Sequence, residues 1–418
     1  MPDPLPSTWL RIACASVGHW QHRSWAFALM VVLGYGLATL PILARHGFDP
    51  SAFIIAGDHF VDARQLASPI IVQPNSSGYD GEFYYRMALS PFRLQQAAFG
   101  VELDHPAYRA RRIFYPLLVW AVTFGHAAAV PVTMYLVNLL GLAAMAMFAM
   151  HLTARLQLPA KLPLAIMLWP GFIIALTHDT TEILAAALLL GAIDAYFAKR
   201  LLVYCVLGGL ATLTRETSVL VLAGVLCFET IQTIRTAGGA LRWHRVLICG
   251  LALAPFLLWQ AALHLVWSHA SQAGTNNLGW PLLGAVIMLR DTLTGAKQFV
   301  QPNRAILDAA VRAYVVVSAG WLLGFCAVVA ARTPVVLRLA GAGALAAGWL
   351  PVIALMSLLT AGGPWVDRNA YFRAFTECYV VGCLVLGLRP PARWLVRLML
   401  AGGTLALLGA LVLTVGEK

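Results

Sequence analysis

The chain has 418 residues, of which only 11% are charged and 60% are hydrophobic, and its mean hydropathy is +0.76. A soluble domain carries about 25% charged residues, so this composition excludes an ordinary soluble protein and indicates a polytopic membrane protein. The formal net charge of +11 does not indicate a nucleic-acid partner, because the cytoplasmic loops of membrane proteins collect Arg and Lys.

The first hydrophobic run predicts a retained transmembrane helix. It reads WAFALMVVLGYGLATLPILA, from Trp25 to Ala44, and follows a short basic N-terminus. The run is long for a signal-peptide core and lacks a small-residue cleavage pattern. We therefore expect it to stay in the membrane, with the N-terminus in the cytoplasm.

Apolar runs fill most of the remaining chain and predict an all-α polytopic membrane protein. Two polar segments, 45–112 and 267–310, interrupt them. We expect a single integral membrane domain over residues 1–418. Its predicted parts are a first outer loop (45–130), a core transmembrane module (131–266), a second outer loop (267–310) and C-terminal transmembrane helices (311–418). The runs lie at 24–44, 113–130, 131–152, 162–177, 180–198, 201–214, 217–234, 245–266, 311–331, 335–359, 372–388 and 394–414.

The run at 113–130 determines the predicted topology. If it crossed the membrane, the short basic loops would all face outward, which violates the positive-inside rule. If it lies in the outer leaflet or dips into it, those loops become cytoplasmic, and Pro116 with the flanking Arg111 and Arg112 suits such a helix. We expect about eleven transmembrane helices plus this periplasmic juxtamembrane or re-entrant helix, in the cell inner membrane. The N-terminus is then inside and the C-terminus outside.

One strongly polar stretch, SGYDGEFYYRMALSPF from Ser77 to Phe92, lies in the predicted first outer loop. A carboxylate such as Asp80 can act as a general base on an acceptor hydroxyl. Arginines can neutralise a phosphate leaving group through paired hydrogen bonds, and aromatic faces commonly stack on sugar rings. Gly78 and Gly81 allow the backbone to turn sharply on either side of Asp80. The substrate-binding candidates in this stretch are Tyr79, Tyr84, Tyr85 and Arg86.

Two further polar motifs, THDTTE (Thr177 to Glu182) and TRET (Thr214 to Thr217), break apolar runs. The helices beside them, about 14–16 residues at about 1.5 Å each, are too short to cross a hydrocarbon core of about 30 Å. They imply a water-accessible cavity that reaches down from the outer face, and charged residues at such breaks are candidates for a functional site. These candidates are His178, Asp179, Glu182, Arg215 and Glu216, together with Arg368 and Arg373 of the segment AGGPWVDRNAYFRAF.

Together these motifs resemble those of the GT-C superfamily of membrane glycosyltransferases. YDGEFYY is similar to the aspartate–glycine–aromatic motif in the first loop of GPI mannosyltransferase II-like and related bacterial polyprenyl-phosphate-sugar transferases. HDTTEILAAALLL and LATLTRETSVLVL are similar to their second-loop and third-loop signatures, so the resemblance covers roughly the first 235 residues. Many members have two adjacent acids, whereas Gly81 separates Asp80 from Glu82 here.

The resemblance implies an inverting transfer of a hexose from a polyprenyl-phosphate-linked donor to a lipid, glycan or protein acceptor at the periplasmic face. Asp80 would be the catalytic base, and Glu82 would share that role or shape the loop. Asp179 or Glu182 would orient a sugar, and Arg215 would bind phosphate or serve the structure. No metal or other cofactor is implied. The donor phosphate ligand stays open among Arg86, Arg109, Arg111, Arg112, Lys297, Arg304, Arg368 and Arg373.

Structural roles compete with these functional ones. Asp80 can cap the helix that follows it, Asp179 can form a capping box with Glu182, and Arg215 can pair with partners inside the membrane. At the level of function, the alternatives are a transporter or lipid flippase, and a non-catalytic envelope-assembly partner. Transporters usually contain internal repeats, which we do not find in this sequence. The seven cysteines form no CxxC motif, so neither a disulfide nor a metal site is predicted.

Overall fold

The computed structural model describes residues 7–236, 239–267, 277–297, 299, 305–367 and 370–417. Helices dominate this part of the chain, and six of them are long and apolar enough to cross a membrane. A mostly helical chain with little sheet and several apolar helices of this length agrees with the expected all-α membrane protein. These six segments are Arg23–Arg45, Val130–Arg155, Thr217–Arg235, Arg242–Val266, Ala305–Leu337 and Arg393–Val415.

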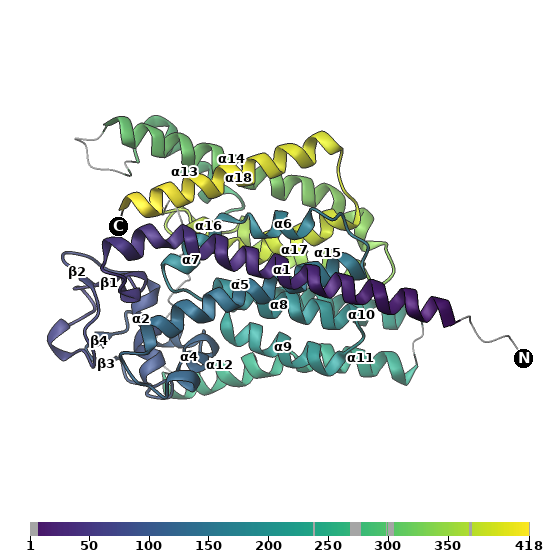
Figure 1. Ribbon diagram of the computed structural model, residues 1–418, viewed down its shortest axis with the longest axis horizontal. Helices are drawn as coiled ribbons and strands as arrows, with labels where there is room; N and C mark the ends of the chain where they lie inside the picture. The colour runs from purple at the N-terminus through teal and green to yellow at the C-terminus, as the bar shows by residue number, and fades with distance from the viewer. Residues whose placement is uncertain are drawn as a thin grey trace, which may run out of the picture.

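The longer helices run roughly side by side along the long axis of the molecule (Figure 1). They bury a shared apolar core in which Trp169 and Trp349 are fully enclosed. The helices of this bundle are α1 (Ser7–Arg45), α5 (Val130–Arg155), α8 (Glu182–Phe197), α9 (Leu201–Thr214), α10 (Thr217–Arg235), α11 (Ala240–Leu251), α12 (Ala254–Val266), α14 (Ala305–Leu337), α15 (Gly343–Ser357), α17 (Thr376–Leu388) and α18 (Arg393–Glu417).

Shorter elements occupy the ends of the bundle and the breaks between its helices. Four two-residue strands form two small sheets: β1 (Ala56–Gly57) pairs parallel with β2 (Val72–Gln73), and β3 (Ala97–Ala98) pairs antiparallel with β4 (Val101–Glu102). The short helices are η1 (Pro50–Phe53), η2 (Ala63–Gln65), α2 (Asp80–Leu89), α3 (Pro106–Ala110), α4 (Phe114–Thr123), α6 (Leu162–Met167), α7 (Pro170–Thr177), α13 (Leu283–Thr294) and α16 (Ala370–Ala374).

The apolar run at 113–130 does not form one continuous helix. Its helical part, α4, has 10 residues and ends where Phe124 and Gly125 both adopt left-handed backbone angles. Ten residues at about 1.5 Å each reach about 15 Å, half the thickness of a hydrocarbon core. Helix α4 is therefore too short to cross a membrane by itself, and it packs against α2 and α5.

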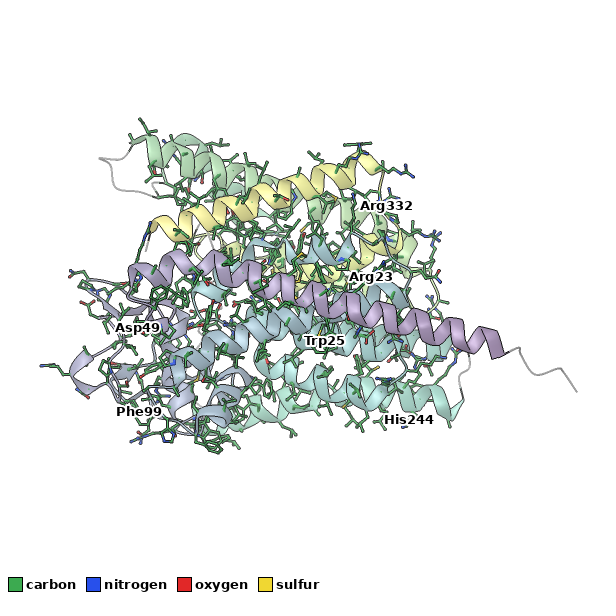
Figure 2. The ribbon with its side chains drawn as sticks, in the orientation of Figure 1. Arg23, Trp25, Asp49, Phe99, His244 and Arg332 are labelled. Carbon is green, nitrogen blue, oxygen red and sulfur yellow. The ribbon has the colours of Figure 1, made fainter. Side chains whose placement is uncertain are left out.

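The two ends of the bundle differ in their loops and in their charge. Asp49 and Phe99 mark the end that carries the polar segment 45–112, and His244 and Arg332 mark the opposite end (Figure 2). We name these the loop end and the basic end. The loops and helix ends at the basic end contain Arg155, Lys161, Lys199, Arg200, Arg235, Arg242, Arg338, Arg389 and Arg393.

Small residues let some helices of the bundle approach closely. At Gly224 of α10, a Cβ atom would collide with the backbone carbonyl oxygen of Ala347 on α15. Such contacts between backbones are typical of helix packing in membranes, where Gly and Ala line the interface. The α10–α15 pair therefore depends on the missing side chain of Gly224.

Candidate functional site

An open cavity lies at the loop end of the bundle, with a volume of about 510 Å³. Its walls come from the start of α2, from α3, from the start of α8, from the α9–α10 junction and from the segment that leads into α16. The main charged and polar lining residues are Tyr79, Asp80, His105, Tyr108, Arg109, Arg112, Glu182, Arg215, Asn277, Asp367 and Arg373.

Glycines place Asp80 at the edge of this cavity. Asp80 is the first residue of α2, and Gly78, two residues earlier, adopts a left-handed backbone with φ of +60°. A Cβ at Gly81 would collide with the carbonyl oxygens of Ile54 and His178. The start of α2 is therefore wedged against two neighbouring backbones, which fixes the direction of the Asp80 side chain.

Three guanidinium groups surround the Asp80 carboxylate, which stays 21% exposed. Arg109 Nη1 lies 2.5 Å from Oδ1, while Arg373 Nη2 lies 2.8 Å and Arg112 Nη1 3.8 Å from Oδ2. Burial alone would raise the pKa of Asp80, but the positive charges of Arg109, Arg373 and Arg112 hold that pKa well below its usual range. Asp80 is therefore ionised at every physiological pH.

Arg109 and Arg112 each have a second carboxylate partner that holds them in place. Arg109 donates from Nε and Nη2 to the two oxygens of Asp104, at 2.8 and 2.7 Å. Arg112 donates from Nε and Nη2 to the two oxygens of Glu216, at 2.9 and 2.7 Å. Such paired hydrogen bonds fix both the position and the plane of a guanidinium group.

A second chain of ion pairs leads from Asp80 into the protein interior. Arg373 of α16 donates from Nε to Glu182 Oε1 at 3.0 Å, and Arg215 Nη2 lies 3.8 Å from the same oxygen. Arg215 is also bonded to the fully buried Glu377 of α17. Buried charges are stable only when they are paired in this way, so the chain couples α8, α9, α16 and α17 at the cavity floor.

The arrangement combines four guanidinium groups with acidic partners around a space that solvent can reach. Guanidinium groups bind phosphate through paired hydrogen bonds, and an ionised carboxylate beside them can accept a proton. Tyr79 lies within the same wall, with the Arg373 guanidinium 4.8 Å from its ring centre. The cavity is therefore chemically suited to an anionic ligand that also presents a hydroxyl group to Asp80.

Not every predicted site residue lines the cavity. Glu82 is buried behind it, where Oε2 accepts a hydrogen bond from Gly57 N at 2.8 Å. Burial raises the pKa of Glu82 to about 8, although the Gly57 hydrogen bond and Arg109 lower it. Glu82 therefore joins the first turn of α2 to β1 instead of sharing the space beside Asp80.

Tyr84, Tyr85 and Arg86 also point away from the cavity, because they continue along α2 into a buried cluster. Tyr84 accepts a hydrogen bond from Arg112 Nη1 at 3.0 Å and so supports the site from behind. Arg86 donates to the backbone carbonyl groups of Arg93 and Gln95. The structure gives these three side chains packing positions, not positions in the cavity lining.

His178 and Asp179 lie beneath the cavity at the turn between α7 and α8. The His178 ring packs edge-on against Tyr79, with ring centres 4.6 Å apart. Asp179 is fully buried and has a left-handed backbone with φ of 45°. The residue that precedes α8 is Thr181, so Asp179 does not occupy the cap position that its sequence pattern predicts. Arg368 and Arg304, predicted as binding candidates, lie outside the described residues.

Sequence reasoning missed Asp104, Tyr108 and Glu377 as parts of the site. Asp104 orients Arg109, the Tyr108 hydroxyl oxygen accepts a hydrogen bond from Arg112 Nη2 at 3.1 Å, and Glu377 pairs with Arg215. Glu377 had a usable signal, because a carboxylate inside the apolar run at 372–388 requires a partner. Asp104 and Tyr108 lie in an ordinary polar loop and had no such signal.

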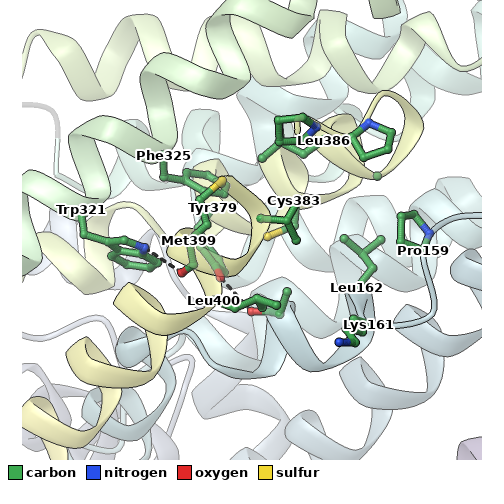
Figure 3. Close-up of a pocket in the computed structure, with 15 residues that line it drawn as sticks. Pro159, Lys161, Leu162, Trp321, Phe325, Tyr379, Cys383, Leu386, Met399 and Leu400 are labelled. Atoms are coloured by element: carbon green, nitrogen blue, oxygen red, sulfur yellow. Dashed lines mark hydrogen bonds between the residues drawn. The ribbon is translucent and has the colours of Figure 1, made fainter. Parts of the chain in front are cut away.

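A second pocket lies in the bundle between α6, α14, α17 and α18 (Figure 3). Its volume is about 90 Å³ and its lining is mostly apolar, including Trp321, Phe325 and Leu400. Trp321 Nε1 donates to the carbonyl oxygen of Met399 at 3.0 Å, which fixes one wall. This pocket offers packing surface and little chemistry, so we place the candidate site in the cavity around Asp80.

No protein-family model, no curated protein and no solved structure matches this chain. Within the described ranges, no group of three or more His, Cys, Asp or Glu side chains is placed to hold a metal ion. The fold and site define a helical membrane protein with an arginine–carboxylate cavity at one end of its bundle.

Proposed function

We propose that this protein is a membrane glycosyltransferase that moves a sugar from a polyprenyl-phosphate donor to an acceptor hydroxyl with inversion. The observation that carries the proposal is the position of Asp80, an ionised carboxylate in an open cavity where Arg109, Arg112 and Arg373 converge on it. The sequence resemblance to GT-C enzymes supplies the reaction class, and the cavity supplies groups suited to it.

In the proposed reaction, the acceptor oxygen bonds to the anomeric carbon while the bond from that carbon to the phosphate oxygen breaks. The electron pair of the broken bond stays on the phosphate, where guanidinium groups neutralise it. The proton of the acceptor hydroxyl passes to Asp80. Attack from the face opposite the phosphate inverts the anomeric configuration, and no cofactor takes part. The acceptor is a lipid, a glycan or a protein.

The remaining predicted residues receive supporting roles in this proposal. Glu182 orients Arg373, and Glu216 orients Arg112. Glu82 holds the loop before α2, while His178 and Asp179 support Tyr79 and the start of α8 from below. A direct catalytic role therefore falls to Asp80.

We also propose that the cavity faces the periplasm and that the N-terminus is cytoplasmic, in a cell inner membrane. The concentration of basic loops at the opposite end of the bundle supports this orientation. Helix α4, too short to cross alone, supports placing 113–130 at the outer surface. The proposed eleven crossings are α1, α5, α6 with α7, α8, α9, α10, α11 with α12, α14, α15, α17 and α18.

The test of the reaction class is transfer by the purified protein in nanodiscs, with a panel of polyprenyl-phosphate sugars and acceptors. We expect one donor to give a product whose anomeric configuration, read by NMR coupling constants, is opposite to that of the donor. Retained configuration would contradict the proposed mechanism. Absence of transfer together with movement of lipid or solute across the bilayer would support a transporter or flippase instead.

A further inference from the structure

Arg373 differs from the other arginines of the cavity in how it is held. It forms ion pairs with Asp80 Oδ2 and Glu182 Oε1, each at 2.8 Å. Both carboxylates also have another arginine nearby, since Arg109 contacts Asp80 and Arg215 lies close to Glu182. If Arg373 turned to another anion, Asp80 and Glu182 would each keep a positive neighbour.

Arg109 and Arg112 are held differently. Each donates from two nitrogen atoms to both oxygens of a carboxylate of its own, Asp104 or Glu216, and would leave that carboxylate without its arginine if it moved. Arg373 also donates from two nitrogen atoms, but both hydrogen bonds end at Glu182 Oε1, which Arg215 approaches as well. Removing one partner of a buried charge pair is strongly unfavourable. Of these three arginines, Arg373 is the one that can exchange partners with the smallest electrostatic penalty.

We propose that the donor phosphate and Asp80 compete for Arg373, so that phosphate binding frees the Asp80 carboxylate for proton transfer. The inference rests on the proposed function for the nature of the anion, a phosphate attached to a prenyl chain. It also chooses one phosphate ligand among the arginines that the sequence left open.

The two oxygens of Asp80 acquire different tasks in this exchange. Oδ1 stays bonded to Arg109 Nη1, and this bond fixes the plane of the carboxylate. Oδ2 loses its hydrogen bond from Arg373 and keeps only the more distant Arg112, at 3.8 Å. Oδ2 is therefore the atom that accepts the acceptor's proton, and it becomes available only after the donor has bound.

The exchange predicts an unusual result for a catalytic-base variant. Asp80→Asn should bind farnesyl phosphate about tenfold more tightly than the wild type, because a hydrogen-bonded charged competitor for Arg373 has been removed. Arg373→Gln should bind it at least about tenfold more weakly. In the double variant Asp80→Asn/Arg373→Gln, Asp80→Asn should no longer increase the affinity for farnesyl phosphate, because Arg373 is absent.

Affinity is measured with purified full-length protein in nanodiscs, and inorganic phosphate and farnesol serve as further probes. Glu216→Gln is the matched control, since it also removes one negative charge, that of the carboxylate behind Arg112, but leaves the Asp80–Arg373 pair intact. We expect Glu216→Gln to increase the affinity for farnesyl phosphate much less than Asp80→Asn does. Farnesol affinity should not change in any variant. If Asp80→Asn binds both inorganic phosphate and farnesyl phosphate more tightly than the wild type, the effect belongs to the phosphate group.

The inference fails if Asp80→Asn binds farnesyl phosphate no more tightly than the wild type, or if Glu216→Gln gains equally. If Asp80→Asn and the wild type bind farnesyl phosphate equally and the wild type transfers sugar, the proposed function stands and the competition for Arg373 is excluded. Tighter binding by Asp80→Asn, together with no sugar transfer by the wild type from any donor, would retain the competition and remove the proposed function. Should Asp80→Asn not fold, unchanged binding by Arg373→Gln overturns the inference.

Discussion

Two carboxyl groups at the start of α2 show how far environment separates similar side chains. Asp80 faces three guanidinium groups in an open cavity, whereas Glu82 is enclosed behind the loops around Gly57 and Gly78. The pKa of Asp80 is lowered by the arginine charges, and burial raises the pKa of Glu82 to about 8. Groups whose pKa values are pushed apart in this way have different roles.

The raised pKa of Glu82 predicts how stability depends on pH. Because its folded-state pKa of about 8 exceeds the ordinary value of about 4.3, the folded protein binds a proton that the unfolded chain has released. The contribution of this group to stability therefore falls as pH rises from about 4 to about 8. Glu82→Gln should gain stability relative to the wild type between about pH 5 and about pH 9, measured by thermal unfolding in detergent.

The control for this prediction is Glu102→Gln, which changes an exposed carboxyl group on β4 of the same polar segment. Its stability relative to the wild type should be nearly independent of pH over that range. If Glu82→Gln instead lost stability toward high pH, a neutral buried Glu82 would be excluded.

The sequence was sufficient to select Asp80, Glu182, Arg215, Glu216 and Arg373 as site candidates, because charges at breaks in apolar runs require an explanation. It could not separate Asp80 from Glu82, since both belong to one polar motif. The difference arises from Gly57 and Ile54, distant in sequence, whose backbones close over α2.

At the scale of single elements, apolar runs predicted helix positions well and helix breaks poorly. The run at 131–152 became α5, Val130–Arg155. The run at 335–359 instead contains the end of α14 and all of α15, divided near Gly341, which has φ of +70°. Proline divides another predicted run, since Pro170 opens α7 after the end of α6.

The contact between α10 and α15 gives a prediction at this scale. Gly224→Ala should destabilise the protein by about 1–3 kcal/mol, because the added Cβ would overlap the Ala347 carbonyl oxygen and force the helices apart. Gly320→Ala on α14 is the matched control, as it has open space around it and should change stability by about 1 kcal/mol or less. Thermal or denaturant unfolding in detergent measures both. If Gly224→Ala and Gly320→Ala changed stability equally, the helices α10 and α15 could move apart at no cost.

At the scale of the whole molecule, the cavity joins segments that lie far apart in the chain. Asp80, Glu182, Arg215 and Arg373 meet there although nearly 300 residues separate the first from the last. Each position is visible in the sequence as a polar break, but their meeting depends on how the bundle packs. That is why the sequence pointed to these four residues as candidates and not to the ion pairs between them.

The proposed orientation predicts which loops a membrane-impermeant thiol reagent reaches. In a cysteine-free background, Arg64→Cys should be labelled from outside intact spheroplasts, because Arg64 lies at the loop end and its side chain is 89% exposed. Arg200→Cys, in an exposed loop at the basic end, should be labelled only after the membrane is opened. The opposite pattern would place the cavity on the cytoplasmic side.

The most direct test of the central claim, that Asp80 performs the chemistry in the arginine cavity, is the sugar-transfer rate of Asp80→Asn under saturating donor. We predict a loss of at least about 100-fold, since a general base contributes about 10²–10⁴-fold, while the variant binds farnesyl phosphate at least as tightly as the wild type does and keeps its thermal unfolding midpoint. Transfer at the wild-type rate by the folded variant would contradict the account and remove Asp80 from the reaction.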